Sequence, residues 1–442
     1  MPDRQVCLKS LLLMLVAFTC MGSHSEASLK TDHIPMAART VLARAGKLMH
    51  QKAYDRAIRA LTAFQQRGNP VPMPGEPDPK GYGHPMVYFF LGNCHLALKN
   101  YHQAQELLSQ AVSRDPDFTE AWMNLAKTYF ERQKYEQAAQ CYLTAYNKSH
   151  QNTADSLYFS ALGYLMASRY GLAIIAFQKL FDRHPDRITL QWQGHFARAL
   201  LADGQPRRAL PLIRDLAAQS SPQGRTEWQE ILLYQYLQLD MQTEALALAN
   251  ELTRRHCTTA KWWKALAQVH LSAGRYPEAL TALTIYGFLA PLSIPEKKLR
   301  ADLYLQLNIP GKAAAQYHEI LNDQFDEAVL RNLVLAYERL DQYPEALDLL
   351  THYAPGTENP GLLMLKADLY YALKRYPEAE NIYRRVALKK KADAGQAWMM
   401  AGYAAWQGED INAGRRAFEE AVKDSRYRKA ARLALQQMGK LK

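Results

Sequence analysis

The sequence contains 442 residues, of which 48% are hydrophobic and 22% charged, and its formal net charge is +11. These proportions are normal for a soluble folded protein, so the chain can hold two or three domains or one long repeat array. Beyond the first twenty residues no stretch approaches the roughly 18 consecutive apolar residues of a membrane-spanning helix, so we expect the mature protein to be water-soluble.

Residues 1–27 have the layout of a secretory signal peptide. Arg4 and Lys9 precede an apolar run at 11–18, and a short stretch of small and polar residues follows, ending at Ala27. We therefore expect cleavage near Ala27 and a mature protein in the periplasm.

The cysteines favour neither a disulfide framework nor a metal site. Cys20 closes the apolar run of the leader, so lipid attachment there is an alternative to simple cleavage. Cys94, Cys141 and Cys257 would remain in the mature chain, odd in number, widely separated and without a CxxC pattern. We interpret them as small hydrophobic residues in helices.

One hexapeptide recurs along the chain, as RYPEAL at 275–280, QYPEAL at 342–347 and RYPEAE at 375–380. Aligning its small residue gives a series at intervals of 33 to 36 residues after a first interval of 47. The series is Ala57, Ala104, Ala138, Ala173, Ala209, Ala245, Ala279, Ala313, Ala346, Ala379 and Gly414. A regular period of this length predicts a solenoid of stacked repeats.

A second small residue stands twelve positions before most members of this series. It occurs at Ala45, Gly92, Ala126, Ala161, Ala197, Ala267, Ala301, Ala367 and Gly402, with Leu233 and Val334 as exceptions. Two small residues at fixed spacing allow the backbones of two antiparallel helices to approach closely. We predict one helix pair per repeat, with the proline of the hexapeptide in the first turn of the second helix.

These patterns resemble the tetratricopeptide repeat family. The third repeat carries the family's residues at Ala121, Trp122, Leu125, Ala126, Tyr129, Tyr135, Ala138, Tyr142 and Ala145. The resemblance covers about residues 38 to 428 and implies an all-α, right-handed superhelical solenoid of about eleven repeats. Four repeats lack the usual aromatic three residues before the key position, having Pro206, Gln242, Pro310 and Ile411 there, so their pairing is less strongly specified.

The resemblance and the composition divide the chain into five parts. The signal peptide at 1–27 is followed by an N-terminal segment with the first repeat at 28–66. Residues 67–84 form an insertion too rich in Pro and Gly to be helical, either a functional loop or an excursion without consequence. The array continues over 85–428, and 429–442 form a basic capping helix and tail.

Motifs for catalysis are absent from the sequence. It contains no glycine-rich phosphate loop, no HExxH, no GxSxG and no paired cysteine signature. The 13 histidines show no ligand spacing, and His95 and His270 stand where the repeat motif places an aromatic. We therefore expect neither enzymatic activity nor a cofactor or metal ion.

In the family that the chain resembles, the first helices line an inner groove that binds partners. The corresponding positions here include Asn93, Lys127, Tyr158, Arg198, Tyr234, Lys264, Lys298, Arg331, Tyr371, Tyr403 and Trp406. Cations and aromatic rings together suit a peptide with acidic groups. The alternative is an ordinary solvated helix face, because any surface helix carries some Lys and Arg.

The excess positive charge is concentrated at the C-terminal end. From residue 384 onward there are 14 Lys and Arg against 6 Asp and Glu, a balance of +8. Nine of these cations form two clusters, Arg384, Arg385, Lys389, Lys390 and Lys391 in one and Arg426, Arg428, Lys429 and Arg432 in the other. This basic patch suits an acidic partner or an anionic membrane surface, whereas export makes nucleic acid a poor partner. Simple solubility of the end cap is the alternative.

The sequence thus predicts an exported, periplasmic scaffold that binds protein partners of a cell-envelope complex. The segment 397–438 looks like the tail of repeat proteins encoded beside ExbB/ExbD/TonB-type transport components, which implies a role in energy-dependent uptake. Adaptors in outer-membrane protein assembly or polysaccharide export are the alternatives, as is a cell-wall or lipid-surface binder acting through the basic end.

Overall fold

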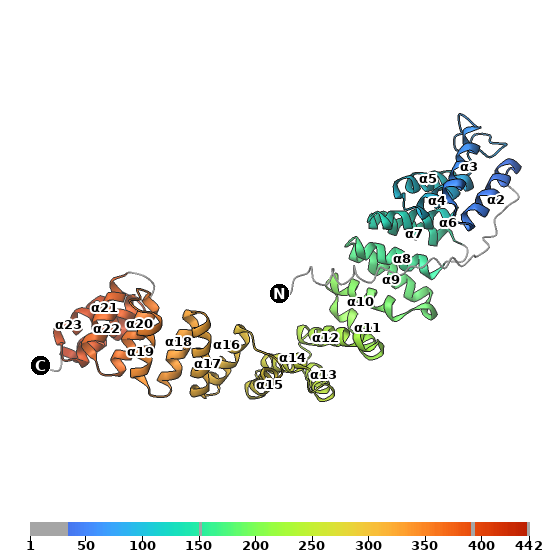
Figure 1. Ribbon diagram of the computed structural model, residues 1–442. Coiled ribbons are helices and arrows are strands. Elements are labelled where there is room, and N and C mark those ends of the chain that lie inside the picture. The colour runs from blue at the N-terminus through green and yellow to red at the C-terminus, as the bar shows by residue number, and fades with distance from the viewer. Residues whose placement is uncertain (1–33, 150–152, 390–393, 440–442) are drawn as a thin grey trace. The chain divides into compact units, whose positions relative to one another are not determined.

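The computed structural model describes residues 34–149, 153–389 and 394–439 (Figure 1). The signal peptide, Cys20, Lys390 and Lys391 lie outside these ranges. Within them the elements are 23 α-helices and one short 3-10 helix, and no strand occurs. The all-α prediction is therefore confirmed. No helix among the described residues combines the length and the apolar character needed to cross a membrane.

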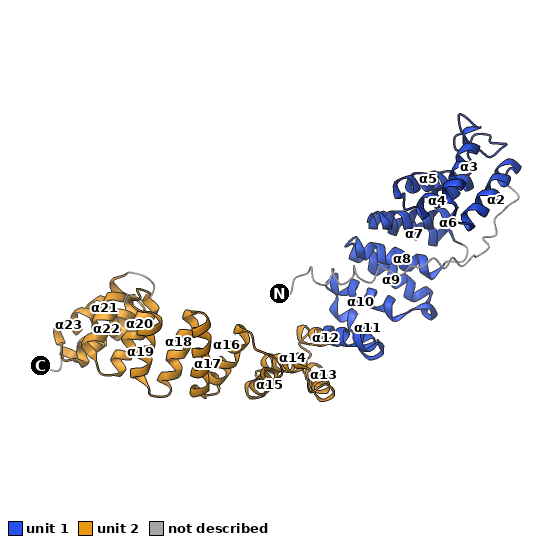
Figure 2. Ribbon diagram, viewed as in Figure 1, with its two compact units in different colours: residues 1–232 blue, residues 233–442 orange. Residues whose placement is uncertain are grey.

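The chain forms two compact units, residues 1–232 and 233–442 (Figure 2). Buried hydrophobic clusters lie within each of them. The helices of unit 1 are α2 (Met36–His50), α3 (Tyr54–Gln66), α4 (Pro85–Ala97), α5 (Tyr101–Arg114), α6 (Thr119–Glu131), α7 (Tyr135–Lys148), α8 (Ala154–Met166), α9 (Tyr170–Arg183), η3 (Pro185–Arg187), α10 (Leu190–Ala202) and α11 (Pro206–Gln219). The next helix, α12 (Pro222–Gln238), contains the boundary.

Unit 2 continues the same alternation of helices. Its elements are α13 (Gln242–Arg255), α14 (Ala260–Ser272), α15 (Tyr276–Leu289), α16 (Ile294–Gln306), α17 (Pro310–Asp323), α18 (Glu327–Glu338), α19 (Tyr343–Tyr353), α20 (Pro360–Ala372), α21 (Tyr376–Leu388), α22 (Ala394–Gln407), α23 (Ile411–Ala421) and α24 (Arg428–Gly439). Even-numbered helices up to α22 are the first helices of repeats and odd-numbered ones the second helices, and α24 is the predicted cap.

The predicted small residues form the contacts between paired helices. All ten alanines of the first series, from Ala57 to Ala379, are 0% exposed. In the last repeat a Cβ at Gly402 would lie 2.5 Å from the ring of Phe418, so only glycine allows α22 and α23 to approach this closely. Every second helix begins three residues before its small residue, including those that start at Pro206, Gln242, Pro310 and Ile411. A missing aromatic at this position therefore does not disturb the repeat.

The turn inside each repeat contains a residue in the left-handed region, which the sequence analysis did not predict. These eleven residues are Lys52, Lys99, Gln133, Ser168, Gly204, Asp240, Gly274, Asn308, Asp341, Lys374 and Glu409. Each stands five residues before the aligned small residue and ends the first helix. Only two of the eleven are glycine, so the positions of glycine in the sequence do not predict this turn.

The insertion at 67–84 contains no helix but is held in place by side chains. The Asp78 carboxylate accepts hydrogen bonds from the backbone N–H groups of Gly81, Tyr82 and Gly83 at 2.6 to 2.9 Å. Arg114 of α5 donates to the Pro72 carbonyl at 3.1 Å. Unit 1 thus carries an ordered loop beside its first two repeats.

Candidate interaction face

Successive first helices lie side by side within each unit. In unit 1, α4 contacts α6 and α8 contacts α10, and in unit 2, α16 contacts α18. We call the surface made by these helices the first-helix face. All of the residues predicted to line the groove lie on first helices. Five of them, Asn93, Tyr158, Arg198, Lys264 and Lys298, contact the next first helix or its N-cap.

Stacked rings connect α8 to α10 in unit 1. Tyr158 is buried and stacks on Trp192 with ring centroids 4.6 Å apart and an interplanar angle of 13°. The Tyr158 hydroxyl lies 2.9 Å from His195 Nδ1. Burial, together with the nearby Arg198 guanidinium, lowers the pKa of His195 to about 4. The imidazole is therefore neutral at neutral pH and can accept the tyrosine hydrogen bond.

Arg198 extends this strip of side chains from α10 to α12. Its guanidinium forms an ion pair of 2.8 Å with Glu227 and lies 4.9 Å from the ring centroid of Trp228. The Trp228 ring passes so close to α10 that a Cβ at Gly194 would meet it at 3.0 Å. Tyr158, Trp192, His195, Arg198 and Trp228 thus form one aromatic and cationic strip across three first helices.

Three further predicted groove residues, Asn93, Lys127 and Tyr234, lie outside this strip. Asn93 of α4 accepts a hydrogen bond of 2.7 Å from Asn124 of α6. Lys127 is exposed on α6, and Tyr234 of α12 is 50% exposed. The last two side chains are accessible to a partner.

Ion pairs connect the first helices of unit 2. Lys264 of α14 reaches Glu296 of α16 at 2.6 Å and lies 5.8 Å from the ring centroid of Tyr286. Partial burial raises the pKa of Glu296, but hydrogen bonds from Lys264 and from Ser293 outweigh it and bring the pKa to about 2. The Glu296 carboxylate is therefore ionised throughout the physiological range.

The same arrangement recurs in the next repeats. Lys298 of α16 lies 3.4 Å from Asp326, whose carboxylate also caps the N-terminus of α18. Arg331 binds Glu327 on its own helix at 2.7 Å, and Glu327 accepts a hydrogen bond of 2.7 Å from Asn359 at the start of α20. Each predicted groove cation from Arg198 to Arg331 thus has a carboxylate partner. The sequence did not predict these pairs, because most of the carboxylates belong to the following repeat.

Carboxyl groups also occupy the first-helix face of unit 2. Asp302 accepts hydrogen bonds from the hydroxyl of Tyr317 at 2.6 Å and from the amide of Asn332 at 3.0 Å. Asp368 accepts one from the Tyr383 hydroxyl. Burial raises the pKa of Asp368, and burial together with the Asp368 charge raises the pKa of Glu338.

The aromatic residues predicted near the C-terminus divide between surface and core. Tyr371 is half-buried and makes an edge contact with Tyr376, with ring centroids 5.5 Å apart. Tyr403 and Trp406 both pack on Phe418 in the core beneath α24. The last two residues therefore stabilise the end of the array as well as reaching its surface.

Most described cations of the predicted basic patch have acidic partners. Arg385 and Lys389 both bind Glu358, Arg384 lies 3.6 Å from Glu380, and Arg426 lies 2.9 Å from Asp424. Three remaining cations, Arg428, Lys429 and Arg432, line a hollow of about 460 Å³ on α24 together with Ser425, Leu433 and Gln436. The predicted patch is thus two regions with different electrostatics.

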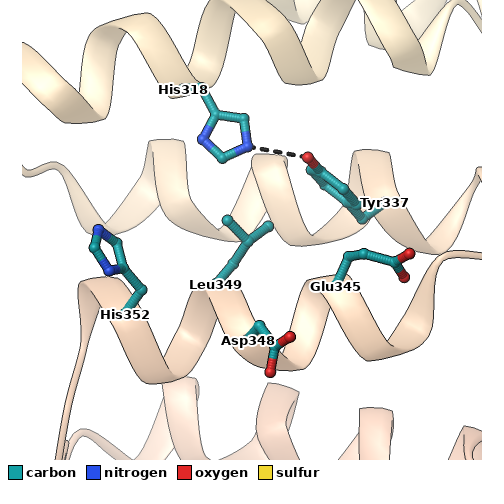
Figure 3. A pocket seen from close by; sticks show the side chains of 6 residues that line it. All are labelled: His318, Tyr337, Glu345, Asp348, Leu349 and His352. Atoms are coloured by element: carbon teal, nitrogen blue, oxygen red, sulfur yellow. Dashed lines mark hydrogen bonds between the residues drawn. The ribbon is translucent and has the colours of Figure 1, made fainter.

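A smaller pocket of about 230 Å³ opens between second helices of unit 2 (Figure 3). His318 projects from α17 and its Nε2 lies 3.1 Å from the Tyr337 hydroxyl, while Glu345, Asp348, Leu349 and His352 come from α19. Burial and the proximity of His352 lower the pKa of His318. No group of three or more candidate ligands in the described ranges is placed to hold a metal ion.

Comparison with known proteins identifies the repeats. Two family models, both described as tetratricopeptide repeat, match residues 84–160 in one case and 243–286 and 364–431 in the other. A search of curated proteins found no match.

Several solved structures match the chain at low sequence identity. A structure of Naa15/Naa10 bound to HypK-THB is 14% identical with a TM-score of 0.39, covering 88% of this chain and 64% of that one, so this chain spans less than two thirds of its length. A tetratricopeptide repeat protein from Parabacteroides merdae is 14% identical with a TM-score of 0.32, covering 68% and 98% of the two chains. YrrB, described as having an unusual peptide-binding site, is 18% identical with a TM-score of 0.35, covering 44% and 97%.

Proposed function

Because the chain is a tetratricopeptide-repeat protein, we propose that it is a scaffold whose first-helix face holds protein partners of a cell-envelope complex. The observation that supports this proposal is the series of contacts between neighbouring first helices on that face. Tyr158, Trp192 and Arg198 make these contacts in unit 1, and Lys264 and Lys298 make them in unit 2. The rings are buried, but the cations beside them are partly exposed. Partly exposed charges that recur from repeat to repeat suit an extended or helical segment better than a small molecule.

The positive charges on the first-helix face favour a partner segment with acidic side chains. Lys264 and Lys298 are partly exposed and each is already paired, so a partner carboxylate must compete with Glu296 or Asp326. A charge-assisted hydrogen bond from the lysine to a partner carboxylate is favoured where the lysine side chain is more exposed, as Lys264 is at 59%. We therefore propose a segment with acidic side chains that binds on top of these ion pairs.

We also propose that the chain is exported and acts in the periplasm. The leader-like layout of residues 1–27 supports export, and the similarity of 397–438 to repeat proteins encoded beside ExbB/ExbD/TonB-type components supports partnership with such a motor. Adaptors for outer-membrane protein assembly or polysaccharide export share this general role. None of these roles calls for catalysis, so we propose a non-enzymatic protein.

Crosslinking and pull-down from envelopes of the native host tests the scaffold role. The charge reversal Lys264→Glu/Lys298→Glu/Arg331→Glu should abolish recovery of a discrete partner, because it turns three cations of the face into repulsive groups. A matched control, Lys312→Glu/Arg415→Glu/Arg416→Glu, changes the same charge at exposed positions on second helices and should retain the partner. Equal recovery with all variants would refute the assignment of the first-helix face.

Export is tested separately by N-terminal sequencing and osmotic-shock fractionation. A mature protein in the periplasmic fraction that begins near Ser28 is expected. A chain with an intact Met1 in the cytoplasmic fraction would contradict the proposed location. Detection of an acylated Cys20 would show that the protein is anchored by a lipid and is not cleaved at Ala27.

A further inference from the structure

The last helix, α24, buries one face and leaves the other open. Ala431, Ala434 and Met438 pack in the core beside Met399 and Phe418. On the opposite side lie Arg428, Lys429, Arg432, Leu433 and Gln436, which line the hollow described above. These five residues follow the helical spacing of a single face along about two turns. We call this surface the cap face.

The cations of the cap face differ from the other described cations of the basic patch. Arg384, Arg385, Lys389 and Arg426 all have carboxylate partners. Arg428 donates to the Val422 carbonyl at 3.2 Å and lies near Asp424. In the described ranges neither Lys429 nor Arg432 forms an ion pair with any carboxylate. The positive charge of this end therefore stays uncompensated where the hollow lies.

An apolar side chain stands among these charges. Leu433 is 56% exposed, although it is on a helix whose other face is fully packed. Exposed leucine surrounded by cations gains from a partner that covers it with apolar surface and places carboxylates around the edge. The geometry points to an acidic amphipathic helix of another protein as the occupant of the cap face.

Charge argues against a second copy of this chain as the occupant. Two cap faces brought together would oppose Lys429 and Arg432 with the same residues. The first helix of a second copy would also repel the cap face, because α2 carries Arg39, Arg44 and Lys47 and no acidic residue. A helix is the expected shape because the open face of α24 is the kind of surface on which a further helix stacks in a helical array. This site is separate from the first-helix face and does not depend on the function proposed for it.

The test measures binding of the full-length mature protein to an 18-residue helical peptide with glutamates along one edge and leucines along the other. Fluorescence anisotropy should show binding that weakens as salt rises. A scrambled peptide of the same composition should bind at least tenfold more weakly. Equal binding of both peptides, or no binding of either, would overturn the proposal.

Variants locate the site. Lys429→Glu/Arg432→Glu should weaken binding at least tenfold, and Leu433→Asn several-fold, while circular dichroism shows unchanged helix content. Arg415→Glu/Arg416→Glu on α23, a matched double reversal outside the hollow, should change affinity less than twofold. Unchanged binding in Lys429→Glu/Arg432→Glu would refute the site. Binding to phosphatidylglycerol vesicles without binding to the peptide would replace the proposed helix by a membrane surface.

Discussion

Single side chains on the first-helix face combine packing with unusual protonation, and His195 is the clearest case. Its ring stacks on Tyr158, which also stacks on Trp192, and it is too buried to be charged readily. A histidine of this kind is a neutral hydrogen-bonding member of an aromatic strip. The sequence alone placed Tyr158 and Arg198 on this face but did not select His195, because its burial depends on how α8 and α10 pack.

Stability should depend on pH through His195. Its pKa is about 4 in the folded protein, below the ordinary value of 6.5, so between these pH values the unfolded chain binds a proton that the folded one does not. The free energy of unfolding should therefore fall by roughly 2 to 3 kcal/mol between pH 7 and pH 4.5 from this residue. Urea unfolding at both pH values should show a smaller decrease in His195→Gln, and equal decreases in the two proteins would contradict this prediction.

Glu338 should destabilise the protein when it is charged. Burial and the nearby Asp368 charge raise its pKa, so the ionised form is disfavoured in the folded state. Glu338→Gln should raise the free energy of unfolding at pH 7 by about 0.5 kcal/mol, a small value because the side chain is only half-buried. The gain should disappear near pH 3.5, where the carboxyl is protonated. Glu419→Gln at an exposed position is the control and should have no effect.

Within a repeat, the element that sets the geometry is the turn with its left-handed residue. Nine of these residues in the described ranges are not glycine, and each is in a conformation that L-amino acids disfavour by about 1 kcal/mol. The small residue five positions later, such as Ala138, is 0% exposed in the second helix, so packing of the helix pair maintains the conformation of the turn. The strain is therefore a consequence of close helix packing.

Glycine at such a turn should stabilise the protein. Gln133→Gly and Lys99→Gly remove the steric conflict at φ values near 60° and should each raise the free energy of unfolding by about 0.5 kcal/mol, net of the added flexibility of the unfolded chain. The reverse change, Gly204→Ala, should lower it by about 1 kcal/mol, since φ is +75° and no atom crowds the site. Thermal and urea unfolding measure both effects, and a loss of stability in Gln133→Gly would refute this account.

Close approach of two helices should make Gly402 intolerant of substitution. The added methyl of Gly402→Ala would meet the Phe418 ring, which is 0% exposed and has no room to move. We expect a loss of about 2 kcal/mol in the free energy of unfolding. Gly171→Ala on α9 is the control, because nothing lies within 4 Å, and it should be neutral or slightly stabilising.

The helix pairs could be predicted from the sequence because a small residue recurs in the second helix of every repeat at a nearly constant spacing. The turns could not be predicted, because nine of the eleven left-handed residues are not glycine and belong to six different residue types. The family resemblance predicted which positions of the first helices belong to the first-helix face. It did not predict the carboxylates that pair with Lys264 and Lys298, because Glu296 and Asp326 come within reach only when the following repeat is stacked.

At the scale of the whole molecule, two units with separate cores should fold separately. Helix α12 contains the boundary, so fragments 28–240 and 222–442 each need this helix complete. Both should be helical and should unfold cooperatively, because repeats are stabilised by their immediate neighbours. Circular dichroism during urea titration measures this. An unfolded fragment beside a folded full-length chain would show that the units depend on each other.

The pattern of contacts also determines how fast the chain can fold. The main helix contacts join elements that are adjacent along the chain or next but one, such as α4 with α5 and α4 with α6. Chains with such local contacts fold quickly, since little loop entropy is lost before contacts form. A repeat can therefore acquire structure while the ribosome is still synthesising the next one. If the chain is exported, translocation or a holding chaperone has to act before the first repeats fold.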